Sequence, residues 1–168
     1  MYRWILLLLV SVMLTGCAVD RPADAAALVQ TMVGALPDGG AAGQLYFFDA
    51  LDPDPDAHTA AAMPDSLIAA AFGDGCAVPP EFAAIEAYAV RLCGFAEPIE
   101  CGCFVAARER DAEAIAAMCL RRVEAAARLC GREVTAEPPL VMGRCVFYAI
   151  GSGADAALAV ARAAMRGT

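Results

Sequence analysis

The sequence predicts an α+β fold in which a small antiparallel sheet carries helices packed on one face. Two observations predict it. Segments in which apolar and polar residues alternate, a pattern typical of strands, occur in pairs joined by short turns. Each pair is followed by a segment whose apolar residues recur at helical spacing. The C-terminal half is therefore expected to run strand, strand, helix, strand, strand, helix, with the strands paired antiparallel.

The first half of the chain is less regular. The turn formed by residues 37–40 ends its first apolar segment, and residues 53–64 form a loop interrupted by prolines. The elements expected here are a helix from an Asp24 cap to about Leu36, a strand over 45–48 and a short helix over 67–72 that Asp65 or Ser66 caps.

The second half is better patterned. The expected elements are strands over 88–93 and 99–105, a helix from Asp111 to Gly131, strands over 140–142 and 145–150, and a helix over 154–165. In the second of these strands, one face carries Ile99, Cys101, Cys103 and Val105, and the other carries Glu100, Gly102 and Phe104. The apolar face of the long helix consists of Ala112, Ile115, Cys119, Val123, Ala126 and Cys130.

The N-terminal sequence has the features of an export signal. Arg3 precedes an apolar stretch over 4–14, which is too short to span about 30 Å of hydrocarbon and is typical of a secretory signal. The sequence Leu-Thr-Gly-Cys that ends at Cys17 resembles the lipobox of bacterial lipoproteins, whose Cys receives a diacylglycerol before a peptidase cuts in front of it. Residues 1–16 are thus expected to be a lipoprotein signal peptide and Cys17 the lipidation site. The alternative is an ordinary signal peptide with an incidental Cys.

The lipoprotein signal predicts the organisation of the mature chain. Residues 17–23 would form a lipid-anchored tether that reaches only about 3.3 Å per residue, and residues 24–168 a single domain, as suits a chain of 168 residues. The membrane, reached through the lipid anchor, is the first expected partner. The expected location is the cell membrane, with the domain on its extracytoplasmic side.

The charge is strongly acidic and unevenly distributed. A net charge of −8 argues against a nucleic-acid partner, because phosphate contacts need a basic surface. Residues 22–90 include ten acids and no Arg, whereas residues 91–168 include ten Arg and nine acids. The asymmetry indicates either two surfaces with different partners or two halves of one domain that attract each other.

The stretch from EAYAVRLCGF to the helix containing Arg121 and Arg122, followed by PLVMGRCVFYAIGSG, resembles an uncharacterised family of bacterial lipoproteins, domain of unknown function 4358. The resemblance covers roughly residues 64–165, with Arg121-Arg122 in the place of the family's basic pair and residues 151–153 in that of its last turn. The resemblance implies only the fold and a lipobox that directs the chain to the membrane, because the family has no established activity or catalytic residues.

Seven cysteines remain after Cys17, an odd number in a chain expected to be exported. Three interpretations stay open. The thiols are buried as small apolar residues, or one or two disulfides form, or Cys101 and Cys103 take part in a metal or redox site. Cys101 and Cys103 lie about 6.5 Å apart on one strand face, near the upper limit for a disulfide. We expect no bound metal and no cofactor, since the spacings typical of zinc sites do not occur.

Other motifs give weaker signals. Asp52, Asp54 and Asp56 have the spacing of a calcium loop, but Ala57 and Met63 stand where that loop needs Gly and Glu. Residues 151–156 imitate a dinucleotide-binding glycine motif, yet no strand can follow before the end of the given sequence, so a turn with a capping Ser152 or Asp155 is the better interpretation.

No catalytic residue is assigned. The single His58 gives no basis for a catalytic triad, and the carboxylate groups at 97 and 100 and at 109–113 stand at expected turns and helix starts, where acids cap or are solvated. The sequence therefore predicts a non-enzymatic binding or envelope-assembly module with an envelope protein as its possible partner. The alternative is a thiol-based metal-binding or redox protein that uses Cys101 and Cys103.

Overall fold

The computed structural model describes residues 24–37, 43–52, 60–93, 99–129 and 137–167. In these ranges the chain forms five strands, four α-helices and two short 3-10 turns. In chain order the elements are α2 (Ala25–Gly34), β1 (Gly43–Asp49), α3 (Asp65–Phe72), η3 (Pro80–Ala84), β2 (Ile85–Cys93), β3 (Glu100–Ala106), η4 (Glu109–Asp111), α4 (Ala112–Leu129), β4 (Leu140–Met142), β5 (Cys145–Ile150) and α5 (Ala154–Arg166).

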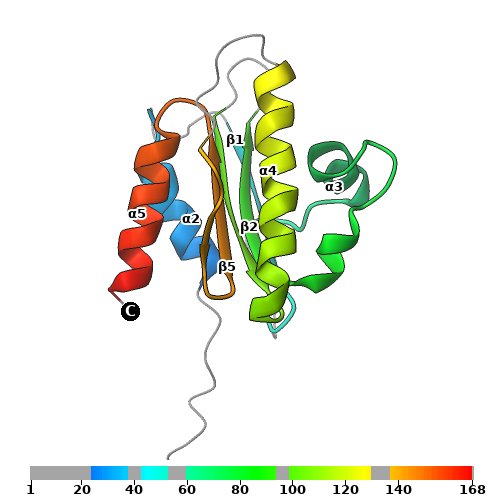
Figure 1. Cartoon of the computed structure of the whole chain (residues 1–168), viewed down its shortest axis with the longest axis horizontal. Helices are drawn as coiled ribbons and strands as arrows, with labels where there is room; N and C mark the ends of the chain where they lie inside the picture. The colour runs from blue at the N-terminus through cyan, green and yellow to red at the C-terminus, as the bar shows by residue number, and fades with distance from the viewer. Residues whose placement is uncertain (1–23, 38–42, 53–59, 94–98, 130–136, 168) are drawn as a thin grey trace, which may run out of the picture.

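The strands form one sheet in the order β1-β2-β3-β5-β4, and every neighbouring pair is antiparallel. The α+β class, the antiparallel sheet and the strand-strand-helix order of the second half are thereby confirmed. The expectation that the helices pack on one face is wrong. Helices α2 and α5 cover one face of the sheet, and α3 and α4 lie on the other (Figure 1).

The reason is that the central strands are apolar on both faces. Every residue of β3 and of β5 is buried, so a single layer of helices could not exclude water from them. The face under α2 and α5 is lined mostly by small side chains, which allow the helices to approach closely: Ala87, Ala89, Cys101, Cys103 and Ala149. Because Ala and Cys contribute little to a hydrophobic pattern, the sequence does not indicate the second helix layer.

The opposite face is aromatic. Phe104 and Tyr148 stack at a centroid distance of 6.1 Å, and Phe72 of α3 meets them edge-on at 5.3 and 5.9 Å. Gly102 makes room for this packing, because a Cβ at that position would lie 2.5 Å from the ring of Tyr148. The absence of a side chain in the middle of β3 is therefore what lets the Tyr148 ring lie against the strand.

Cap geometry is described at the starts of α2, α3 and α5, and the predicted cap is present in α2 alone of these three. The Asp24 carboxylate accepts a hydrogen bond from the Ala27 N–H at 3.1 Å, which confirms the predicted cap of α2. Helix α3 instead follows Pro64 with no side-chain cap bond, so neither Asp65 nor Ser66 caps it. Helix α5 follows Gly153, whose φ of +83° is left-handed, and neither Ser152 nor Asp155 caps it.

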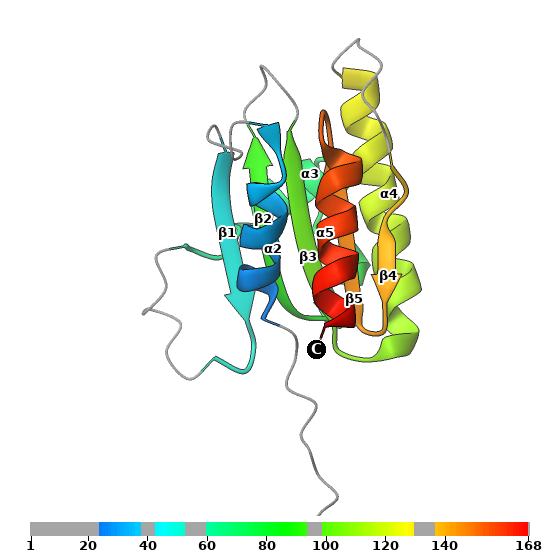
Figure 2. The same cartoon turned by 90° about the vertical axis from the view of Figure 1, so that its left-hand side faces the viewer.

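Helix α2 begins at the end of the sheet at which β1 finishes, and α5 ends there as well (Figure 2). Within the described ranges, no helix is long and apolar enough to cross a membrane. The expected signal peptide, Cys17 and the tether over 17–23 all lie outside the described residues, as do the acidic loop over 53–59 and the turn over 94–98.

Candidate functional site

Strand β3 places Cys101 and Cys103 on the sheet face that α2 and α5 cover, and neither residue has any exposed surface. The alternation predicted for this strand is confirmed. In the pairing of β3 with β5, Cys103 lies opposite Phe147, and Val105 lies opposite Cys145. Cys145 is therefore the diagonal neighbour of Cys103 on the same face.

The two diagonal thiols interact. The S–H of Cys103 donates a hydrogen bond to the sulfur of Cys145, which raises the pKa of Cys103 well above its ordinary value and lowers that of Cys145. Burial adds to the rise at Cys103, and the nearby Arg144 guanidinium adds to the fall at Cys145. The sequence did not indicate this pair, because only the register between two strands distant in sequence brings the residues together.

The remaining described thiols have different surroundings. Cys119 of α4 is buried on the opposite face of the sheet, where desolvation raises its pKa strongly. Cys76 is exposed in the segment after α3. The residues with assigned positions contain no group of three or more Cys, His, Asp or Glu side chains arranged to hold a metal ion. Cys93 ends β2, and Cys130 lies outside the described residues.

A buried ion pair lies on the aromatic face. Glu100 is 2% exposed, and its carboxylate accepts hydrogen bonds from Arg122 Nε and Nη2 at 2.8 and 2.7 Å. The expectation that Glu100 is solvated in a turn is wrong, because it begins β3 and faces α4. The nearby Tyr148 hydroxyl is fully buried and has no hydrogen-bond partner. Burial, and then the Glu100 charge, raise the pKa of Tyr148 well above its ordinary value.

Two further ion pairs connect the acidic first half of the chain with the arginines of the second. Arg121 Nη2 lies 2.8 Å from Glu81 Oε1, and Arg144 Nη1 lies 2.7 Å from Glu86 Oε2. Although burial opposes it, the hydrogen bond from Arg121 lowers the pKa of Glu81. Part of the charge asymmetry therefore serves attraction within one domain, which is the second of the two interpretations that the sequence allowed.

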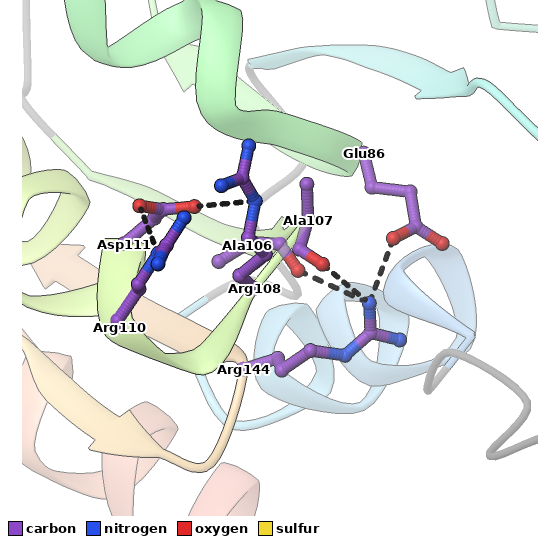
Figure 3. Close-up of polar contacts among 7 residues, drawn as sticks. All are labelled: Glu86, Ala106, Ala107, Arg108, Arg110, Asp111 and Arg144. Atoms are coloured by element: carbon purple, nitrogen blue, oxygen red, sulfur yellow. Dashed lines mark hydrogen bonds and ion pairs between the residues drawn. The ribbon is translucent and has the colours of Figure 1, made fainter.

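Arg144 also ties together one end of the sheet. It stands in the turn between β4 and β5 and donates to the carbonyls of Ala106 and Ala107, both at 3.3 Å (Figure 3). Beside it, the Asp111 carboxylate lies between Arg108 and Arg110, at 3.7 and 4.0 Å from their Nε atoms. The bonds of Arg144 therefore join the β4–β5 turn to the end of β3 and to Glu86 of β2.

Two of the four exposed large apolar side chains among the described residues lie at the end of β1. Phe48 is 38% exposed and stacks on Tyr88 at 5.6 Å, and Leu51, two residues beyond the end of the strand, is 63% exposed. Among the described strands, β1 has β2 as its single neighbour, and the Phe47 N–H donates to the Ala61 carbonyl at 3.1 Å. The edge is thus partly covered by the chain itself. We use the term apolar patch for the two exposed apolar residues that lie three positions apart at the end of β1, Phe48 and Leu51.

Comparison with known proteins adds no relative to this description. No family model, no curated protein and no solved structure matches the chain.

Proposed function

We propose that the chain is a membrane-anchored extracytoplasmic lipoprotein whose domain binds a protein partner of the cell envelope and catalyses no reaction. The lipobox ending at Cys17 supports the anchor. The apolar patch of Phe48 and Leu51 at the β1 edge supports the binding role, and it is the observation that carries the proposal. Exposed edge strands can pair with another chain, and exposed apolar side chains at the end of β1 would add contact area to such an interface.

The position of the patch fits the anchor. β1 ends at the end of the sheet where α2 begins (Figure 2), so Leu51 and the first described residue, Asp24, belong to the same end of the domain. A tether of residues 17–23 can extend about 25 Å at most. An acylated Cys17 would therefore hold the patch within reach of envelope proteins embedded in, or bound to, the same membrane.

The anchor is tested by metabolic labelling. Cells that express the wild type or Cys17→Ala are grown with a fatty-acid analogue, and the purified proteins are assayed for incorporated label. Label is expected in the wild type alone, together with loss of residues 1–16 by mass spectrometry. Equal labelling of both proteins would contradict the anchor.

The binding surface is tested by crosslinking in cells with a photoreactive residue at Leu51. The matched control places the same residue at Leu120 of α4, which is 40% exposed but lies on the helix layer away from the β1 edge. A discrete crosslinked protein is expected from position 51 and none from position 120. The same products from both positions would indicate collision without a specific surface.

Charge reversal adds a second control. Asp52, Asp54 and Asp56 follow Leu51 directly in the sequence, so their reversal should alter the yield of the Leu51 crosslink and its dependence on salt if the acids contribute to partner recognition. An unchanged yield and an unchanged set of partners would leave solubility as the role of these acids.

A thiol-based metal-binding or redox protein is the second candidate function. The sequence pointed to Cys101 and Cys103, and the contact of Cys103 with Cys145 is the observation that favours thiol chemistry on this face. Metal analysis of the purified protein distinguishes the two branches of this candidate. A bound soft metal ion favours the metal branch.

A further inference from the structure

We propose that Cys103 and Cys145 form a redox dithiol, which closes to an intramolecular disulfide when a disulfide-bearing oxidant reaches it and reopens in thiol reductants. The pair goes beyond the contact role assigned to the domain. Its biological setting rests on the proposed export, because disulfides form and persist in oxidising compartments outside the cytosol. Its chemistry depends only on the two side chains.

The geometry places the two sulfurs in reach of each other. Cys103 and Cys145 share one face of adjacent strands, and their thiols are hydrogen-bonded. Diagonal neighbours in an antiparallel sheet have Cα atoms about 7–8 Å apart, with the Cβ atoms closer. A disulfide usually joins Cα atoms up to about 6.8 Å apart. Closure therefore requires β3 and β5 to move slightly closer at this point. A bond formed beyond the usual range is strained and is more easily reduced than an unconstrained structural disulfide.

Cys145 and Cys103 differ in exposure and in their place along the strand, and this difference assigns each a step in the reaction. Cys145 is the first residue of β5, directly after the turn that contains Arg144, and it is 4% exposed, whereas Cys103 in the middle of β3 is fully buried. The hydrogen bond from Cys103 lowers the pKa of Cys145, so its thiolate is the easier one to form. Cys145 is thus the attacking thiol and Cys103 the resolving thiol.

The reaction balances as an exchange of thiol for disulfide. The Cys145 thiol loses its proton, and its thiolate attacks one sulfur of the oxidant, R–S–S–R, forming a Cys145–S–S–R bond and releasing R–S⁻, which takes up a proton. Cys103 then loses its proton and attacks the Cys145 sulfur, so that the second R–S⁻ leaves and is protonated. Two thiols of the protein are oxidised, one disulfide of the oxidant is reduced to two thiols, and no other reagent is consumed.

Oxidised glutathione provides the test. The protein is purified from membranes in detergent, reduced, desalted and incubated with oxidised glutathione in its folded state. It is then denatured and alkylated with N-ethylmaleimide. A peptide crosslink between Cys103 and Cys145 is expected, with at least about a tenfold loss of maleimide labelling at both residues that dithiothreitol reverses.

Single variants separate the two steps. In Cys103→Ser the glutathione mixed disulfide should remain on Cys145, because the resolving thiol is missing. In Cys145→Ser the buried Cys103 should stay unmodified. Cys119→Ser, which removes a buried thiol on the opposite face, should behave as the wild type. The wild-type measurement decides the proposal even if a variant does not fold.

Three results would overturn it. Full alkylation of both cysteines after oxidation would show that the thiols do not react, and a crosslink to any other cysteine would assign the dithiol elsewhere. A soft metal ion bound in stoichiometric amount and lost from both Cys103→Ser and Cys145→Ser would make the pair a metal site. Because Cys17→Ala can be assayed in the same way, failure of the anchor and failure of the dithiol give different results.

Discussion

Arg122 of α4 and Glu100 of β3 form a bidentate ion pair, in which two nitrogens of one guanidinium bond the two oxygens of one carboxylate at 2.8 and 2.7 Å. The pair joins the long helix to the sheet at the start of β3. Because the Glu100 carboxylate is 2% exposed, its charge depends on Arg122 for compensation. The Arg122 side chain is 18% exposed, so the ion pair extends from the core toward solvent.

Loss of this arginine should destabilise the domain strongly. We expect Arg122→Ala to lower the free energy of unfolding by about 3–5 kcal/mol, because it leaves the Glu100 charge buried without a partner. The measurement is urea unfolding followed by circular dichroism.

The neighbouring Arg121 provides the matched control. Its ion pair with Glu81 leaves 52% of the Arg121 side chain exposed, and Arg121→Ala is expected to cost about 1 kcal/mol or less. A double variant, Glu100→Met with Arg122→Met, should recover much of the loss, since a buried pair can often be replaced by apolar packing. Equal effects of Arg121→Ala and Arg122→Ala would contradict the assignment of a buried bridge.

Much of the fold could be predicted from the sequence because the strand alternation and the helical spacing of apolar residues are regular. The strand β3 alternates as predicted, and α4 buries Ile115, Cys119 and Val123 on the stripe that the spacing indicates. The second helix layer was not readable, because the face it covers is lined by residues such as Ala89 and Cys103 that contribute little to a hydrophobic pattern. The continuous apolar run of β5 was the available sign of burial on both faces.

The candidate site was less predictable than the fold. Cys101 and Cys103 are close in sequence, yet the thiol that Cys103 contacts is that of Cys145 in β5. Likewise, the sequence places Glu100 at the start of a strand next to a turn, but it does not show that α4 brings Arg122 against this carboxylate. Both relationships depend on strand register and helix docking, and a single sequence does not specify either.

The two buried tyrosines should respond in opposite directions to loss of their hydroxyl groups. The Tyr148 hydroxyl has no hydrogen-bond partner, so Tyr148→Phe is expected to stabilise the protein or leave it unchanged, within about 1 kcal/mol. The Tyr88 hydroxyl accepts a hydrogen bond from the Met63 N–H at 2.8 Å, and Tyr88→Phe should cost about 1–2 kcal/mol. Thermal unfolding of the two variants in parallel checks this, and a loss at Tyr148 as large as that at Tyr88 would reveal a hydrogen bond to that hydroxyl.

The described thiols should divide sharply by reactivity with a maleimide. Cys76 is exposed and should react first, whereas Cys101, Cys103 and Cys119 have no exposed surface and should react about 100-fold more slowly. Cys145, which is 4% exposed and has a lowered pKa, should react at a rate between these two groups. Peptide mapping after timed labelling assigns each rate, and labelling in denaturant should bring the five residues to similar rates. Rapid native labelling of Cys119 would contradict the packing of α4 against the sheet.

The free energy of unfolding should fall at alkaline pH because the Cys119 thiol is buried. Desolvation by the core, followed by the nearby Glu100 charge, raises the pKa of Cys119 far above its ordinary value of 9.0. The folded protein therefore holds this proton more tightly than the unfolded chain does. The stabilisation is complete below about pH 9 and is lost as the pH rises above it, with a slope of up to about 1.4 kcal/mol per pH unit for one thiol.

Two variants without a titrating group at this position isolate the effect. Cys119→Ala and Cys119→Val differ in packing and should differ in stability at pH 7, because one leaves a small cavity and the other adds volume. Both should nevertheless show a shallower decline of the unfolding free energy between pH 9 and pH 10.5 than the wild type. Tyr88 and Tyr148, whose pKa values are also raised, remain in both variants, so part of the alkaline decline should persist. If the slopes of the wild type and both variants were the same, the Cys119 thiol would already be ionised in the folded protein, or accessible to hydroxide, and the dry interface between α4 and the sheet would have to be abandoned.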